Sequence, residues 1–260
     1  KSPQEESHRQ KSTTIESMLY IFDCWKLVVS FCEAREWTQL SYCCKGLNRL
    51  KFDRELMSNK TMTSKIRTNP SEIQNALRLS KGCIFNAVFA GRAYLTDEHI
   101  QLLSGIHTLK IPLCYRITGK TFDHLKGIHT LNMNNCDKIM DDAFVHLQGI
   151  HTLSISNCQQ ITDKAFIHLK GIHTLDMSYC DQITDDAFVH LEGIHSLNMS
   201  HCGRITDDAF VHLKGIHTLD MSGRENITDK ALAHLKGIHT LTISSHTKIT
   251  DKAFIHFKGI

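Results

Sequence analysis

The sequence predicts an α/β solenoid in which a curved parallel β-sheet is backed by short convex helices, built from 22-residue units. Two observations carry this prediction. From residue 105 to the end of the chain, the string GIHTL, once GIHSL, returns every 22 residues. Within each copy, apolar residues first alternate with the period of a strand and then cluster with the spacing of a helix. A short, fixed period is typical of folds in which each unit packs only against its neighbours.

The first part of each unit predicts a strand. In the unit 171–192, Leu175 and Met177 are two residues apart, so an extended backbone turns both toward the core and leaves Asp176 facing outward. Cys180 is expected to end the strand and to point inward as a small, weakly polar group. Strands from successive units are expected to stack in parallel, because one unit cannot bury its own apolar face.

The second part of each unit predicts a short helix. Thr184 is expected to cap it, with Asp185 in the first turn, where the helix dipole favours a negative charge. Ala187, Phe188 and Leu191 then share one face. A 22-residue unit leaves room for about two helical turns, so the convex elements are expected to be short α- or 3₁₀-helices.

The repeated positions carry a family resemblance. Ile172, Leu175, Met177 and Cys180 fill the pattern L-x-x-L-x-L-x-x-C, which resembles the leucine-rich repeat in its cysteine-containing subtype. Seven units match in register, and a degenerate eighth unit precedes them, with Ala87, Phe89 and Leu95-Thr96-Asp97 in the matching places. The resemblance implies a leucine-rich-repeat solenoid over residues 83–260. Arg92, Arg224 and His246 replace the cysteine in three units, and we expect those turns to be opened or hydrated. The chain stops just after beginning another unit, which we interpret as a fragment of a longer protein.

A different composition precedes the repeats. Residues 1–14 are expected to form a disordered tail, 15–62 a small all-α domain, and 63–82 a linker with a short helix. Residues 25–50 resemble the F-box. The residues that carry this resemblance are Ser30-Phe31, Ala34-Arg35-Glu36 and the segment from Leu40 to Asn48. Tyr20-Ile21 stands where that family has Leu-Pro.

An F-box followed by leucine-rich repeats resembles the substrate receptors of SCF ubiquitin ligases. This implies a non-catalytic, cytoplasmic or nuclear protein whose partners are a Skp-type adaptor with its cullin complex and a protein target. The adaptor-binding residues would be Trp25, Val28, Val29, Phe31, Trp37, Leu40, Cys44 and Leu47. The alternative is a leucine-rich-repeat scaffold outside the ubiquitin pathway, in which the N-terminal helices only cap the solenoid.

The target-binding residues are expected where the copies differ, namely at the outward strand positions, at the residue before each cysteine, and in the loop after it. This prediction selects Lys110, Tyr115, Arg116, Asn132, Asn135, Asp176, Tyr179, Asn198, His201, Arg204 and Asp220. Drift of solvent-exposed positions would explain the same variation.

Other functions find little support in the composition. No clustered basic stripe predicts nucleic-acid binding, no apolar run is long enough for a membrane span, and no cofactor motif is present. Two rows of repeated histidines invite a metal site, but ligands spaced along a repeat do not converge on one point, so we favour packing or solvation. Protonation of such rows is expected to lower stability below about pH 6.5. The repeated cysteines are interpreted as core residues rather than redox groups.

Overall fold

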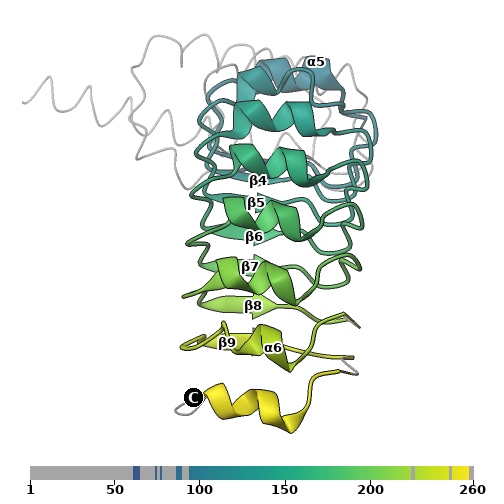
Figure 1. Ribbon diagram of the computed structural model, residues 1–260. Helices are drawn as coiled ribbons and strands as arrows, with labels where there is room; N and C mark the ends of the chain where they lie inside the picture. The colour runs from purple at the N-terminus through teal and green to yellow at the C-terminus, as the bar shows by residue number, and fades with distance from the viewer. Residues whose placement is uncertain are drawn as a thin grey trace, which may run out of the picture.

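The computed structural model describes residues 61–64, 74, 77, 86–89, 94–223, 226–245 and 248–257. Within these residues the strands form one parallel sheet in chain order, one strand per unit, as the stacked layers of Figure 1 show. The nine strands are β1 (Thr61–Ser64), β2 (Asn86–Phe89), β3 (Thr108–Lys110), β4 (Thr130–Asn132), β5 (Thr152–Ser154), β6 (Thr174–Asp176), β7 (Ser196–Asn198), β8 (Thr218–Asp220) and β9 (Thr240–Thr242).

Short helices cover the other side of each unit, and most of them are 3₁₀-helices (Figure 1). They are α5 (Asp97–Ile100), η1 (Gln101–Leu103), η2 (Phe122–Leu125), η3 (Asp141–Leu147), η4 (Asp163–His168), η5 (Asp185–His190), η6 (Asp207–Leu213), α6 (Asp229–Leu232) and η7 (Asp251–Phe257). The expectation of short convex α- or 3₁₀-helices is confirmed. The helix cap was also placed correctly, because the Thr184 hydroxyl accepts a hydrogen bond from the backbone N–H of Asp186 at 3.3 Å.

The core repeats once per unit. Leu153 pairs in register with Leu175, and Leu175 with Leu197, so that each strand places its central leucine above the previous one. In the unit 171–192, Leu175 is 1% exposed and Met177, Cys180 and Phe188 are fully buried. Burying large apolar side chains of this kind stabilises the fold by about 1.5–3 kcal/mol each, and an equivalent set recurs in the neighbouring units, with Ile155 in place of the methionine in one of them.

Each repeated thiol has a structural partner as well as a packing role. The Cys180 thiol donates to the Ile155 carbonyl of the preceding unit at 3.1 Å, and the Cys158 thiol donates to the Met133 carbonyl at 3.2 Å. The Ile155 carbonyl also accepts the backbone N–H of Cys158 at 3.1 Å, so there the thiol supplies a second donor to a carbonyl inside the core. This explains why a small donor stands here in place of an aliphatic residue.

A carboxylate bridge joins successive units on the convex side. Asp185 Oδ1 accepts the backbone N–H of Thr206 at 2.8 Å, and Oδ2 accepts the Thr206 hydroxyl at 2.6 Å. Equivalent bridges start from Asp97, Asp141, Asp163, Asp207 and Asp229. The first turn of each helix therefore anchors the cap residue of the next unit.

One interface lacks this bridge on both sides. Gly119 stands where the other units have the aspartate, and Met140, 21 residues later, stands where they have the threonine. A side chain at Gly119 would place its Cβ only 2.5 Å from Ala143 Cβ. The Met140 side chain is 54% exposed. Both partners are thus missing at the same interface, as expected if neither is useful alone.

The N-terminal edge of the sheet contains a strand that the repeat pattern did not indicate. β1 pairs in parallel with β2, from Thr61 opposite Asn86 to Ser64 opposite Phe89. Its sequence, TMTS, lacks the paired leucines of the later units. The degenerate unit itself was placed correctly, because Ala87 and Phe89 are fully buried in β2 and α5 begins at Asp97.

Several expectations fall outside the described residues. These are the tail 1–14, the helices of the F-box-like segment with all eight adaptor-binding candidates, and the cysteine-replacing residues Arg92, Arg224 and His246. Across the part of the chain that is described, no helix is long and apolar enough to cross a membrane.

Candidate functional site

The candidate residues on the strands form one line across the concave face. Lys110 pairs in register with Asn132. Asp176 pairs with Asn198, and Asn198 with Asp220. Neighbouring parallel strands lie about 4.8 Å apart, so these side chains form a continuous polar row. The row offers both charges and amides to a partner.

The polar row is held in place by hydrogen bonds. Asp176 Oδ1 accepts from the backbone N–H and the hydroxyl of Ser178, at 3.1 and 2.8 Å. Its Oδ2 lies 3.1 Å from Ser154 Oγ, which is also 2.6 Å from Asn134 Oδ1. Side chains fixed in this way lose little freedom when a partner binds, which favours recognition.

The residue before each cysteine adopts a left-handed backbone conformation. The positive φ angles, between 56° and 72°, belong to Leu113, Asn135, Asn157, Tyr179, His201, Gly223 and Ser245. Glycine and asparagine accept this conformation readily, whereas other residues lose about 1–2 kcal/mol. Three of the seven positions therefore carry an unstrained residue, and Leu113, Tyr179, His201 and Ser245 carry a strained one.

Two of the strained residues form an aromatic pair. The rings of Tyr179 and His201 stack with centroids 4.4 Å apart and planes 10° from parallel. Tyr179 is 50% exposed. Gly223 makes room for the pair, because a Cβ at that position would lie 2.3 Å from the His201 ring. Strain, stacking and the adjoining glycine together place a planar, exposed surface at the strand exit.

The loops after the cysteine positions hold the remaining candidates. Tyr115 is 39% exposed, and Arg204 is exposed as well. Arg116 lies over the ring of Tyr94, with its guanidinium carbon 5.2 Å from the centroid, which is a cation–π contact. These three residues and the aromatic pair line the same side of the strands, and we call this line of residues the exit rim.

The sequence pattern missed residues that support the exit rim. Gln159 Nε2 donates to the Tyr179 carbonyl at 2.6 Å and lies 2.9 Å from Asn157 Oδ1. Asn157 Nδ2 in turn donates to Asn135 Oδ1 at 2.8 Å. Part of the signal was present, because Gln159 stands where the neighbouring units have Asp137 and Asp181, but only the structure indicates that it is linked to Asn157 and Tyr179.

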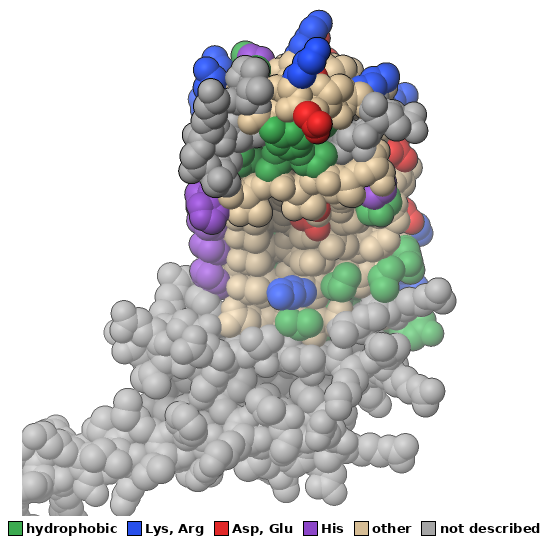
Figure 2. Space-filling view, turned by 90° about the horizontal axis from the view of Figure 1, so that it is seen from below, with side chains coloured by type: hydrophobic (Ala, Val, Ile, Leu, Met, Phe, Trp, Pro, Cys, Tyr) green, Lys and Arg blue, Asp and Glu red, His purple; other side chains and the backbone are tan. Residues whose placement is uncertain are grey.

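A second surface lies at the opposite end of the strands. Seven imidazoles stack in a continuous row, which we call the stacked histidine row; its members are His107, His129, His151, His173, His195, His217 and His239. Ring centroids are 4.4–4.6 Å apart and successive planes turn by 11–14°. The backbone sets this spacing, because the His107 carbonyl accepts hydrogen bonds from the backbone N–H groups of both His129 and Thr130. Histidine side chains form a column along one side of the molecule in Figure 2.

The rings of the row influence one another's protonation. Partial desolvation and the His107 imidazole lower the pKa of His129 below its usual value. Partial desolvation, His195 and His239 lower the pKa of His217 in the same way. A charge placed on one ring therefore disfavours a charge on its neighbours.

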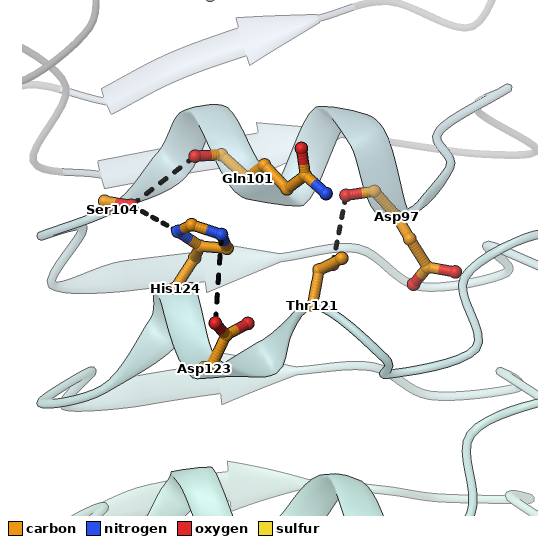
Figure 3. Close-up of polar contacts among 6 residues, drawn as sticks. All are labelled: Asp97, Gln101, Ser104, Thr121, Asp123 and His124. Carbon is orange, nitrogen blue, oxygen red and sulfur yellow. Dashed lines mark hydrogen bonds and ion pairs between the residues drawn. The ribbon is translucent and has the colours of Figure 1, made fainter.

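The other repeated histidines lie toward the ends of the convex helices, and several of them have individual partners. His124 Nδ1 is 3.0 Å from Ser104 Oγ, and its Nε2 is 3.9 Å from the carboxylate of Asp123 (Figure 3). Nearby, the Thr121 hydroxyl donates to the Asp97 carbonyl at 3.0 Å (Figure 3). Farther along, His212 Nδ1 lies 3.1 Å from Glu192 Oε1. Apart from the contact between His124 and Asp123, these contacts join one unit to the next.

In the part of the chain that the structure describes, the residues that could bind a metal or react with an electrophile are not arranged for either role. Among the described residues, no group of three or more His, Cys, Asp or Glu side chains could hold a metal ion. Burial raises the pKa of the Cys114, Cys136 and Cys158 thiols to about 12 and also raises that of Cys180. A thiol that stays protonated is a poor nucleophile, so the thiols act as core donors.

Two solved structures have a similar fold. The first is a chain from the crystal structure of the Rad7 and Elc1 complex in yeast, with a TM-score of 0.54 and 17% identity over 82% of this chain and 68% of that one. The second is a chain from the crystal structure of the TLR13–ssRNA13 complex, with a TM-score of 0.59 and 18% identity over 81% of this chain and 32% of that one. At these identities the likeness concerns the fold. A search of curated proteins finds no match.

A family comparison identifies the repeats themselves. The family described as the BspA type leucine rich repeat region matches residues 102–217 and 137–260, with six copies. The two overlapping matches span more than half of the chain and include the exit rim, the polar row and the stacked histidine row. The protein belongs to the family of BspA-type leucine-rich-repeat proteins.

Proposed function

We propose that this protein binds a protein target on the concave face and the exit rim of its solenoid, and presents that target to an SCF-type ubiquitin ligase. Leucine-rich repeats form protein-interaction modules, and no side chain in the candidate site is arranged for chemistry among the residues described. The observation that carries the proposal is the strained, exposed Tyr179–His201 pair.

Strain at these two positions favours a role in recognition. The same backbone position accepts asparagine or glycine without strain in other units, as at Asn135, Asn157 and Gly223. Tyr179 and His201 instead retain a cost of about 1–2 kcal/mol each. Strained residues that persist in a fold tend to lie at ligand-binding sites. Exposed tyrosines are also common anchors of protein interfaces.

The ubiquitin-ligase part of the proposal rests on the N-terminal resemblance. Ser30-Phe31, Ala34-Arg35-Glu36 and the segment from Leu40 to Asn48 resemble an F-box, whose partner would be a Skp-type adaptor. Val29 and Leu40 occupy apolar positions of the two expected helices. The alternative, a leucine-rich-repeat scaffold outside the ubiquitin pathway, would keep the target-binding surface and lose the adaptor.

The adaptor is tested directly with purified components. The full chain is mixed with a purified Skp-type adaptor and compared with a variant carrying Val29→Asp and Leu40→Asp. We expect a complex with the unmodified chain and none with the variant. Absence of a complex with the unmodified chain would remove the ubiquitin role and leave the scaffold.

The target-binding surface is tested with substitutions that suit the backbone. A variant with Tyr179→Asn and His201→Asn removes both rings and relieves the left-handed strain, so it is expected to fold. Leu113→Asn is the control, because it relieves the left-handed strain at the same repeat position in another unit without removing an aromatic ring. Proteins retained by the unmodified chain and by the control should be lost from the double variant. Equal retention by all three would exclude the pair as an anchor.

A further inference from the structure

The stacked histidine row presents ring edges rather than ring faces. From His129 to His239, six imidazoles follow one another at about 4.5 Å, so the faces between them are covered. Nδ1 of His129 lies 3.1 Å from Thr130 Oγ1, and Nδ1 of His217 lies 3.2 Å from Thr218 Oγ1. The other edge of each ring carries Nε2. Four of the six histidines are exposed, and His129 and His173 are half-buried.

The surroundings of the row are mainly cationic. Three residues before its members stand the exposed side chains of Lys126, Gln148, Lys170, Glu192, Lys214 and Lys236. Glu192 contacts His212, a member of the other histidine series, which lies five residues before each ring.

On the strand side, the charged residues three positions after the rings are Lys110, Asp176 and Asp220. Both carboxylates already accept hydrogen bonds from neighbouring serines. The groups that shift the pKa of His129 and His217 electrostatically are other imidazoles of the row. Protonation therefore builds up a line of positive charge that an external anion would neutralise.

We infer that the stacked histidine row is a second binding surface, which holds an extended acidic peptide segment of a partner protein along its ring edges and binds it more tightly as the solution becomes acidic. This inference does not depend on the ubiquitin role or on the exit rim. Each protonated Nε2 donates a charge-assisted hydrogen bond to a carboxylate, and the neighbouring lysines add attraction that needs no fixed register.

The length and shape of the row favour a flexible peptide. Five gaps of about 4.5 Å make the row from His129 to His239 about 22 Å long. An extended chain rises about 3.3 Å per residue, so about seven residues span it. Successive ring planes are 12–14° from parallel, so the ring edges do not lie on one flat surface. A flexible segment can adjust to such a row.

Nucleic acids fit the row less well. Proteins that bind single strands stack bases on aromatic faces, and here the faces are occupied by neighbouring rings. Carboxylates require only the donors that the ring edges supply.

Binding and proton uptake are linked in this arrangement. A carboxylate placed beside an imidazolium raises the pKa of that ring, which opposes the lowering caused by its neighbours in the free chain. The ligand therefore binds together with protons. Because aspartate side chains stay ionised down to about pH 4, the pH dependence would come from the imidazoles.

The test uses the full chain and a fluorescent peptide of about eight aspartates, a length sufficient for the row. Fluorescence anisotropy at constant salt should give at least a tenfold lower Kd at about pH 5.5 than at about pH 7.5. Circular dichroism at both pH values checks that the chain is folded. No binding at the lower pH by folded protein, or equal affinity at both, would overturn the inference.

Two triple variants locate the surface. Replacing His129, His151 and His173 with glutamine leaves three rings of the six, so it should reduce the pH dependence and weaken binding at least tenfold at the lower pH. The control replaces His146, His168 and His190 with glutamine and should bind like the unmodified chain. Equal losses in both variants would overturn the assignment to the stacked row. Tighter, equally pH-dependent binding of oligothymidylate would overturn it in favour of a nucleic acid.

Discussion

Replacing Asp185 with alanine removes a bridge between two units without touching the apolar core. The carboxylate accepts two hydrogen bonds from Thr206, at 2.8 and 2.6 Å, and the variant leaves both donors without that partner. Hydrogen bonds to a charged group contribute about 1.5–3 kcal/mol each. Both residues are half-buried, so solvent reduces this sum. We expect the free energy of unfolding to fall by about 2–4 kcal/mol.

Asp186 provides a matched control in the same helix. Both aspartates lie in the first turn of η5, so each alanine variant loses the same favourable interaction with the helix dipole, about 0.3–1 kcal/mol. The Asp186 side chain is exposed, and its backbone N–H, which bonds to Thr184, is kept in the variant. Urea unfolding followed by circular dichroism gives both free energies. Equal losses for Asp185→Ala and Asp186→Ala would refute the bridge as a source of stability.

Three further predictions follow from the geometry. The pKa of His129 is lower in the folded chain than its usual 6.5, so the unfolded chain binds protons more tightly than the folded chain. The free energy of unfolding should therefore fall as the pH drops through 6.5. An unchanged Tm between about pH 7.5 and 5.5 would contradict this. Urea unfolding should show a larger loss of stability for Gly223→Ala than for Gly215→Ala. Both glycines have a positive φ, but only at Gly223 would the added Cβ collide with a ring, that of His201. The Cys158 thiol, with its pKa raised to about 12, should resist iodoacetamide at about pH 8 until the chain unfolds, and rapid modification of folded protein would contradict its burial.

The core could be predicted from the sequence because its signals are local. Leu175 and Phe188 lie within one unit, at spacings that fix which face each one occupies, and the structure buries both. The Thr184 cap is similarly local, since its partner is two residues away. β1 was missed because Met62 alone does not make an alternating pattern.

The candidate site was predicted less completely, because its geometry depends on contacts between units. Asp185 was assigned to its own helix, whereas its hydrogen bonds reach a residue 21 positions later. Variation before each cysteine singled out Tyr179 and His201, but a list of side chains does not indicate a left-handed backbone. The spacing of the histidines predicted parallel rows, and only the structure reveals that one of them is a face-to-face stack. The adaptor-binding candidates of the F-box-like segment remain predictions.

The carboxylate bridge also bears on how such a chain can change in length. Because Asp163 meets Thr184 in the same way as Asp185 meets Thr206, each boundary between these copies is interchangeable with the next. Recombination that adds or deletes one copy of 22 residues would join surfaces that already match, without a new contact having to evolve. The boundary between Gly119 and Met140 is the exception, since a copy moved there would find neither partner. Genetic growth and shrinkage of the array should therefore concentrate on the C-terminal side of Met140.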